Sequence, residues 1–131
     1  MRLPLMRVTL LVITLLLTAT AARASEPDTA EIRAAILALF EAATSDDIEK
    51  FRQVTAPAFY SFDGGKRFDG DELMQLIGKL HAEGWIYDWN VREPDITVRG
   101  DVAWLESAVL QKDDGRWRIH FFHSSRSKIR P

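Results

Sequence analysis

The stretch Asp114–Arg126, which reads DGRWRIHFFHSSR, decides the fold of this chain. The Asp113-Asp114-Gly115 run that leads into it is typical of a turn between two strands. A strand is therefore predicted from Arg116 to about Ser125, close to the end of the chain. This strand is expected to close an antiparallel meander.

The residues just upstream also favour strands. Apolar and polar side chains alternate over Trp85–Arg92, and Pro94 then interrupts the pattern. A further hairpin is predicted with strands at Ile96–Arg99 and Val102–Lys112, joined by Gly100-Asp101. The segment Val102–Lys112 is interpreted as one continuous strand.

Helices are predicted ahead of these strands, each behind an acidic residue with a capping partner three positions later. The three pairs are Asp28 with Glu31, Asp46 with Glu49, and Asp69 with Glu72. The first helix carries an apolar stripe made of Ile32, Ala35, Ile36, Leu39, Phe40 and Ala43. Between the second and third helices, Gly64-Gly65 favours a short hairpin. Helices followed by strands predict an α+β domain, with helices packed on a curved antiparallel sheet of about five strands.

Three segments together resemble a known superfamily: the stretch Asp114–Arg126, the Phe68-Asp69-Gly70 entry to the third helix, and Leu105–Leu110. They resemble the nuclear-transport-factor-2-like superfamily in its SnoaL-like branch. They are also similar to the association domain of calcium/calmodulin-dependent kinases. The resemblance implies a cone-shaped fold with a pocket at its open end, found in isomerases, cyclases, dehydratases and non-catalytic modules. Relatives usually carry two strands where this chain has Val102–Lys112, so about one strand is expected to be missing.

The N-terminal residues are typical of a secretory signal peptide. Arg2 and Arg7 precede an uncharged stretch, Val8–Ala22, and Ala22-Arg23-Ala24 fits a cleavage site before Ser25. The alternative is an uncleaved membrane anchor, but the apolar core is shorter than the roughly 20 residues that span a bilayer. We therefore expect a signal peptide at 1–24, a domain at 25–131, and a secreted or periplasmic protein that has no membrane segment after cleavage.

Composition excludes several classes of function. The chain has no cysteine, which excludes disulfides, thiolate metal sites and a cysteine nucleophile. Its isoelectric point of about 5.9 argues against nucleic-acid binding. Three scattered histidines do not make a metal site, so neither a metal nor another cofactor is expected.

The late strands are predicted to be apolar on both faces. Ala103, Leu105 and Val109 are placed on one face, whereas Trp104, Ala108 and Leu110 are placed on the other. One face meets the helices and the second needs another cover. A homodimer through the sheet is therefore expected.

The best acid–base candidates are His123 and Glu106, and the strand register decides whether they meet. If Asp114-Gly115 forms a two-residue turn, Glu106 lies opposite His123 and orients it as a general base. If Asp113-Asp114-Gly115 forms a three-residue turn with a bulge, Glu106 faces Phe122 instead and both residues serve the fold. The residue types favour the second register.

Other side chains are weaker candidates. Tyr60 and Asp63 flank the early hairpin, where a tyrosine hydroxyl can donate to an oxyanion, although strand aromatics and turn aspartates are usually structural. The side chains predicted to line an apolar ligand site are Trp104, Phe121, Trp89 and Asp88. His81 is interpreted as a helix cap.

Three functions follow from these residues. The first is binding of a small apolar molecule in the cone pocket, and the second is an isomerase, cyclase or dehydratase with His123 as base. The third is a structural self-association module.

Overall fold

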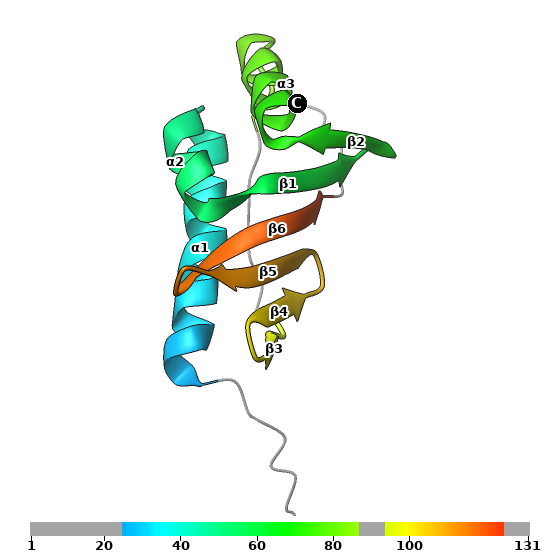
Figure 1. Cartoon of the computed structure of the whole chain (residues 1–131). Coiled ribbons are helices and arrows are strands. Elements are labelled where there is room, and N and C mark those ends of the chain that lie inside the picture. The colour runs from blue at the N-terminus through cyan, green and yellow to red at the C-terminus, as the bar shows by residue number, and fades with distance from the viewer. Residues whose placement is uncertain (1–24, 87–93, 125–131) are drawn as a thin grey trace, which may run out of the picture.

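The structure, a computed structural model, describes residues 25–86 and 94–124 of the chain. These residues form three helices and six strands (Figure 1). In chain order the elements are α1 (Glu26–Thr44), α2 (Ile48–Val54), β1 (Thr55–Asp63), β2 (Lys66–Asp69), α3 (Gly70–Ala82), β3 (Thr97–Arg99), β4 (Val102–Leu105), β5 (Ala108–Asp113) and β6 (Arg116–Ser124). The predicted α+β class is confirmed. Most of the strand predicted at Trp85–Arg92 lies outside the described residues.

All six strands belong to one sheet with the order β2-β1-β6-β5-β4-β3. The neighbours are antiparallel except β1 and β6, which run parallel. The prediction of an all-antiparallel sheet is therefore wrong in this one pairing. A parallel pair needs a long connection, and here that connection contains β2, α3 and the strands β3 to β5.

The predicted strand count is also corrected, from about five to six. Val102–Lys112 is not one strand, because the chain turns at Glu106-Ser107 and Leu105 pairs with Ala108 across that turn. The strand that was expected to be missing is thus present as the second half of this segment. It is short, and its turn contains no glycine, asparagine or proline.

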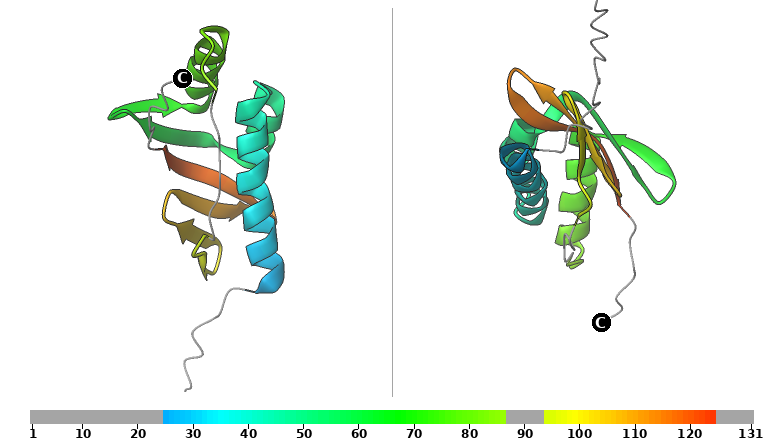
Figure 2. Two further views of the ribbon diagram at one scale, coloured as in Figure 1. Left: turned by 180° about the vertical axis from the view of Figure 1, so that it is seen from behind. Right: turned by 90° about the horizontal axis from the view of Figure 1, so that it is seen from below.

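The helices lie on one face of the twisted sheet, called the inner face below (Figure 2). The turn at Glu106-Ser107 resets the alternation of side chains, so that the buried residues of β4 and β5 all share this face: Ala103, Leu105, Ala108 and Leu110. Ala108 and Leu110 were predicted to point the opposite way, and Val109 was predicted to share a face with Ala103. Val109 instead pairs with Trp104 on the outer face, the face without helices.

The core lies between α1 and the inner face of the sheet. The long helix α1 crosses the strands (Figure 1), and its predicted stripe is buried, with Ile32 fully enclosed and Leu39 only 3% exposed. These side chains belong to the same cluster as Leu110 of β5 and Ile119 of β6. The 3.6-residue period of the helix and the two-residue period of the strands supply the two halves of this core.

The N-terminus of α1 differs from the prediction. Ser25, not Asp28, is the cap, and its hydroxyl accepts from the Asp28 amide at 3.3 Å. Pro27 lies inside the first turn of α1, where a backbone amide hydrogen is not needed. This leaves the Asp28 carboxylate free to bond the sheet, where it accepts from Lys112 Nζ at 2.9 Å and Trp117 Nε1 at 2.8 Å.

Of the other two predicted helix caps, the one for α2 is wrong and the one for α3 is confirmed. Asp47, one residue later than predicted, caps α2 and accepts from the Lys50 amide at 3.0 Å. Asp46 instead adopts a positive φ of 55° between α1 and α2. For α3 the predicted Asp69–Glu72 capping box is confirmed, with both reciprocal bonds formed at 2.8 and 3.0 Å.

Candidate functional site

The predicted acid–base residues do not converge. Tyr60 lies on the outer face, where its ring is 5.1 Å from that of Phe121. His123 is exposed beside Phe62 on the same face. Asp63 is buried, and it lies three residues from Tyr60 on one strand, so its side chain points to the inner face. The structure thus separates Asp63 from the other two.

The observed register does not bring Glu106 to His123. Asp114 and Gly115 form the two-residue turn, with φ values of 50° and 76°, and Asp113 pairs with Arg116. The three-residue turn that was favoured is therefore wrong. The register then shifts by one residue between Leu110 and Val109, and the His123 amide donates to the Ser107 carbonyl at 2.8 Å.

Glu106 itself lies at the turn between β4 and β5. Its carboxylate accepts a long hydrogen bond, 3.4 Å, from the Asp95 amide. His120 is an extra residue on β6 that has no counterpart on β5. This bulge shifts the pairing by one residue, so Glu106 faces neither His123 nor Phe122, the two partners that the registers predicted. The pair on which the enzyme hypothesis depends is not formed.

The remaining two histidines each pair with an aspartate. His120 Nε2 lies 2.9 Å from Asp113 Oδ2, and His81 Nδ1 lies 2.8 Å from Asp46 Oδ1. The second pair joins the end of α3 to the connection between α1 and α2. His81 thus contacts a specific carboxylate instead of acting only as the predicted cap. Both pairs connect elements of the fold.

The predicted ligand-binding aromatics lie on the outer face. Trp104 is 41% exposed, and Phe121 is half-buried between Tyr60 and Val109. Neither side chain points to the inner face that the helices cover. Trp89 and Asp88 lie outside the described residues.

The inner face has one polar feature that the sequence did not indicate. The Ser61 hydroxyl is buried, and within the described part of the chain it has no hydrogen-bond partner. Its neighbours across the strands are Phe68 and Phe122, and Phe122 in turn contacts Phe40 at a ring distance of 5.8 Å. Aromatic side chains therefore surround this hydroxyl.

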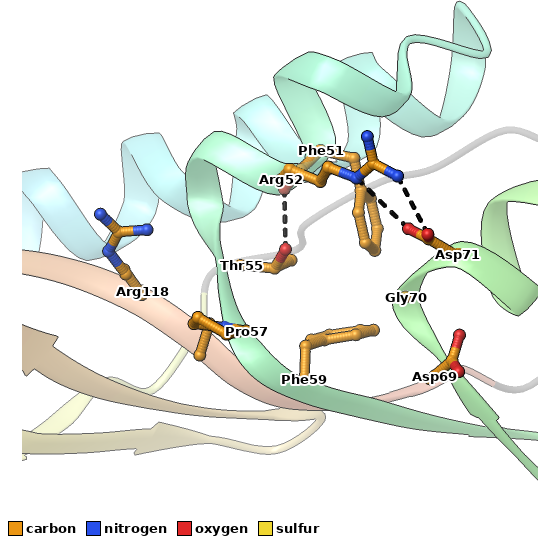
Figure 3. Close-up of a pocket in the computed structure, with 10 residues that line it drawn as sticks. Phe51, Arg52, Thr55, Pro57, Phe59, Asp69, Gly70, Asp71 and Arg118 are labelled. Atoms are coloured by element: carbon orange, nitrogen blue, oxygen red, sulfur yellow. Dashed lines mark hydrogen bonds and ion pairs between the residues drawn. The ribbon is translucent and has the colours of Figure 1, made fainter.

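A pocket of about 460 Å³ opens elsewhere, between α2, the start of β1 and the start of α3 (Figure 3). Its apolar wall includes Phe51 and Phe59, whose rings meet edge to face at 5.3 Å. Pro57 adds an exposed apolar surface beside them. The two rings are almost completely buried, at 1% and 4% exposure, so they pack behind the pocket surface and Pro57 supplies its exposed apolar part.

Gly70 allows the start of α3 to pack closely against Phe51 of α2. A Cβ at this position would lie 3.0 Å from Cε1 of Phe51, closer than ordinary contact. Phe51 is only 1% exposed and packs on Phe59, so it has little room to move. A residue without a side chain is therefore required where α3 approaches α2.

Two guanidinium groups line the pocket, and their surroundings differ. Arg52 binds Asp71 with two hydrogen bonds, of 3.3 Å to Oδ1 and 2.9 Å to Oδ2, and binds Glu49 at 2.8 Å. The hydrogen bonds and charge of Asp71 raise the pKa of Arg52. Arg118 of β6 also lines the pocket, is half-buried, and has no carboxylate partner among the described residues.

Sequence reasoning missed this pocket. Its lining comes from α2, β1, β6 and the β2–α3 junction, and each residue is ordinary in its own segment. The only local signal was the Phe68-Asp69-Gly70 entry to α3, where a glycine follows the capping aspartate. Within the described ranges, no three His, Asp or Glu side chains are grouped to hold a metal ion, and no helix is long and apolar enough to cross a membrane.

Comparison with known proteins gives the fold. No protein-family model matches the chain, and no curated protein sequence matches it. Solved structures do match. A protein of unknown function from Mycobacterium tuberculosis superposes with a TM-score of 0.63 at 16% identity, over 76% of each chain.

Two further structures carry functional names. A ketosteroid isomerase-like protein from Erwinia carotovora has a TM-score of 0.60 at 17% identity, covering 76% of this chain and 95% of its own. A candidate dehydratase of the nuclear-transport-factor-2-like family from Streptomyces avermitilis has a TM-score of 0.59 at 14% identity, covering 76% and 96%. These likenesses confirm the predicted resemblance at the level of the fold. The chain has the fold of nuclear-transport-factor-2-like proteins, and its described residues form three helices on a six-stranded mixed sheet.

Proposed function

We propose that this domain binds a small molecule in the pocket between α2, β1 and α3. The observation that carries the proposal is the pocket itself, about 460 Å³ and lined by both apolar and charged residues. Sites for small ligands typically enclose roughly 300–1,000 Å³ and combine apolar walls with a few polar groups. The proposed site replaces the interior of the cone, which the sequence favoured.

The proposal is binding and names no reaction. Some structural neighbours are described as isomerase or dehydratase proteins, but identities of 14–17% support only the shared fold. In this chain Tyr60 and His123 lie on the opposite face of the sheet from Asp63, and Glu106 is not paired with His123. The enzyme hypothesis therefore lacks an assembled acid–base group.

We also propose that the protein acts after export. The support is the signal-peptide pattern of residues 1–24, together with Ser25 as the helix cap immediately after the predicted cleavage site. N-terminal sequencing of protein from a periplasmic extract is expected to begin at Ser25. An intact Met1 terminus in the membrane fraction would contradict export in soluble form.

The binding proposal is tested with two matched tryptophan variants. Pro57 and Ala58 are adjacent and exposed in β1, but only Pro57 lines the pocket. In an NMR fragment screen, hits are expected to shift the amides of Phe51 and Gly70. Pro57→Trp is expected to abolish these shifts, whereas Ala58→Trp retains them. Hits that ignore Pro57→Trp, or that cluster elsewhere on the chain, would contradict the proposal.

A second candidate function, self-association, is favoured by the outer face of the sheet. Large apolar side chains are exposed there: Phe62 at 36%, Val109 at 37%, and Val102 and Trp104 at 41%. Tyr60 and Phe121 continue this surface between them. An apolar surface of this kind marks an interaction site in many soluble proteins.

Self-association is tested by analytical ultracentrifugation. Trp104→Arg is expected to convert a dimer to a monomer. Leu37→Arg, which changes a 53%-exposed residue of α1, is expected to leave the dimer intact. A wild-type protein that sediments as a monomer at high micromolar concentration would contradict this function.

A further inference from the structure

We infer that the ligand of this pocket is a monocarboxylate with an apolar body and a hydrogen-bond donor at its far end. The inference rests on the proposed binding function and specifies the chemistry of the ligand. Its basis is the arrangement of Arg118, the apolar floor and Asp69 around one pocket.

Arg118 supplies the carboxylate contact. Arg52, the other guanidinium of the pocket, is matched by Asp71 and Glu49, whereas across residues 25–86 and 94–124 no carboxylate pairs with Arg118. Arg118 is also half-buried, so water reaches it less freely than it reaches a surface arginine. A planar guanidinium can bind a carboxylate with two parallel charge-assisted hydrogen bonds, which are stronger than hydrogen bonds between neutral groups.

The apolar floor lies between the two charged ends. In Figure 3 Arg118 is at one end of the pocket and Asp69 is toward the other, with Pro57 and Phe59 between them. A ligand held by Arg118 would lay its body along these two side chains. Aromatic or alicyclic groups suit this surface, because the exposed Pro57 ring is rigid and apolar and the Phe59 ring, only 4% exposed, packs below the pocket surface.

Asp69 defines the far end. Its Oδ1 accepts from the Glu72 amide at 2.8 Å as part of the capping box, which leaves acceptor capacity on the carboxylate. A hydroxyl, amide or ammonium group on the ligand can donate to it. The same negative charge repels a second carboxylate, so the pocket is expected to reject dicarboxylates.

The surroundings favour a carboxylate over a phosphate. Phosphate sites usually combine several donors, often free amides at a helix N-terminus. Here the first turn of α3 is capped by Asp69 and holds Asp71 and Glu72, so that helix end already carries negative charge. One unmatched guanidinium is sufficient for a carboxylate, and it offers little to a dianion beside Asp69.

The test uses 3-(4-hydroxyphenyl)propanoate, its primary amide and inorganic phosphate as probes in NMR titrations of the protein. The acid is expected to shift the resonances of Arg118 and Gly70 and to bind about tenfold more tightly than the amide, the factor typical of a charge-assisted hydrogen bond. Phenylpropanoate, which lacks the hydroxyl, is expected to bind a few-fold more weakly. Phosphate that shifts the same resonances at equal concentration would overturn the ligand class.

Two arginines of β6 provide the matched variants. Arg118→Gln is expected to weaken the acid about tenfold and to leave the amide unchanged. Arg116→Gln, on the same strand but exposed and outside the pocket, is expected to change neither. Asp69→Asn keeps the helix cap and is expected to admit 3-(4-carboxyphenyl)propanoate, a dicarboxylate whose second carboxylate lies at the far end of the ring and which the wild type rejects.

The outcomes separate this inference from the function on which it rests. Acid and amide that bind the pocket equally, with no effect of Arg118→Gln, would overturn the carboxylate and leave small-molecule binding in place. Failure of both the acid and the amide to bind, in a pocket that still binds hits of the fragment screen, would overturn the carboxylate inference alone. Failure of the probes and of the whole fragment screen to bind the pocket would overturn both. Failure of 3-(4-carboxyphenyl)propanoate to bind Asp69→Asn would overturn the role of Asp69 alone.

Discussion

Two regions of the molecule differ in whether their charged groups have partners. One is the junction where α1 meets β5 and β6, and the other is the pocket beside α2. At the junction, the Asp28 carboxylate accepts hydrogen bonds from Ser25, Lys112 and Trp117, at 2.7 to 2.9 Å. At the pocket, Arg118 has no carboxylate partner among the described residues. The first region uses its charge to hold the fold together, whereas the second leaves a charge available to a ligand.

The largest expected effect on stability comes from removing the Asp28 carboxylate at the junction of α1 with β5 and β6. Asp28→Ala removes the shared acceptor and leaves the buried Trp117 indole and the half-buried Lys112 ammonium unmatched. It is expected to lower the free energy of unfolding by about 2 kcal/mol, a value discounted for partial exposure. Urea denaturation measures this. Glu26→Ala, in the same exposed first turn, serves as control, and equal small losses in both variants would show that Asp28 is not structural.

Acidification acts on the same carboxylate. The hydrogen bonds from Ser25, Lys112 and Trp117 lower the pKa of Asp28 well below its usual range. Its contribution to stability is therefore complete above the unfolded pKa of about 3.9 and is lost as the pH falls below that value toward the lowered folded pKa.

Unfolding free energies at pH 7 and pH 3 test this linkage in the wild type and in Asp28→Asn. The variant is expected to lose less stability on acidification, because its side chain does not titrate. An identical loss in both proteins would assign the acid sensitivity to other carboxylates.

Two glycines of α3 test how tightly the helix packs beside the pocket. Gly70→Ala is expected to cost about 1 kcal/mol, because its Cβ would press on the enclosed Phe51 ring. Gly78→Ala has room, with Asp46 Oδ1 3.7 Å from the new Cβ, and is expected to stabilise the helix by roughly 0.5–1 kcal/mol. Thermal denaturation distinguishes the two, and shifts of the same sign would mean that Gly70 is not confined.

The smallest expected effect concerns Arg118 in the absence of ligand. Arg118→Gln removes no ion pair within the described residues, so it is expected to change the unfolding free energy by less than about 0.5 kcal/mol. A loss above about 1 kcal/mol in urea denaturation would place Arg118 among the groups that hold the fold together.

Much of the fold could be predicted because the relevant signals are local. Three such signals each involve residues that are close together in the sequence: the apolar stripe of α1, the Asp69–Glu72 capping box and the Gly64-Gly65 hairpin. Each therefore predicts its own element without knowledge of the rest. The superfamily resemblance adds the arrangement of these elements.

The errors arise where the chain has no local signal. The Glu106-Ser107 turn contains no glycine or proline, so Val102–Lys112 was interpreted as one strand, and the faces of Ala108, Val109 and Leu110 were misassigned. The bulge at His120 depends on how β6 fits β5, and it separates Glu106 from His123. The parallel pairing of β1 with β6 depends on the whole sheet.

The pocket was beyond prediction for the same reason. Arg118 and Asp69 are 49 positions apart in the chain, and only the folded sheet and α3 bring them to one cavity. A residue that lacks a partner is also invisible in a sequence, because charge counting does not show which carboxylate each arginine meets. The candidate site therefore had to come from the structure.

Native mass spectrometry of the protein recovered from the periplasm of producing cells tests the central claim most directly. We expect the wild type and Arg116→Gln to carry an additional bound mass that matches a small organic acid, and Arg118→Gln to lose it. A bound mass that persists unchanged in Arg118→Gln, or none in any of the three proteins, would contradict a carboxylate site at Arg118.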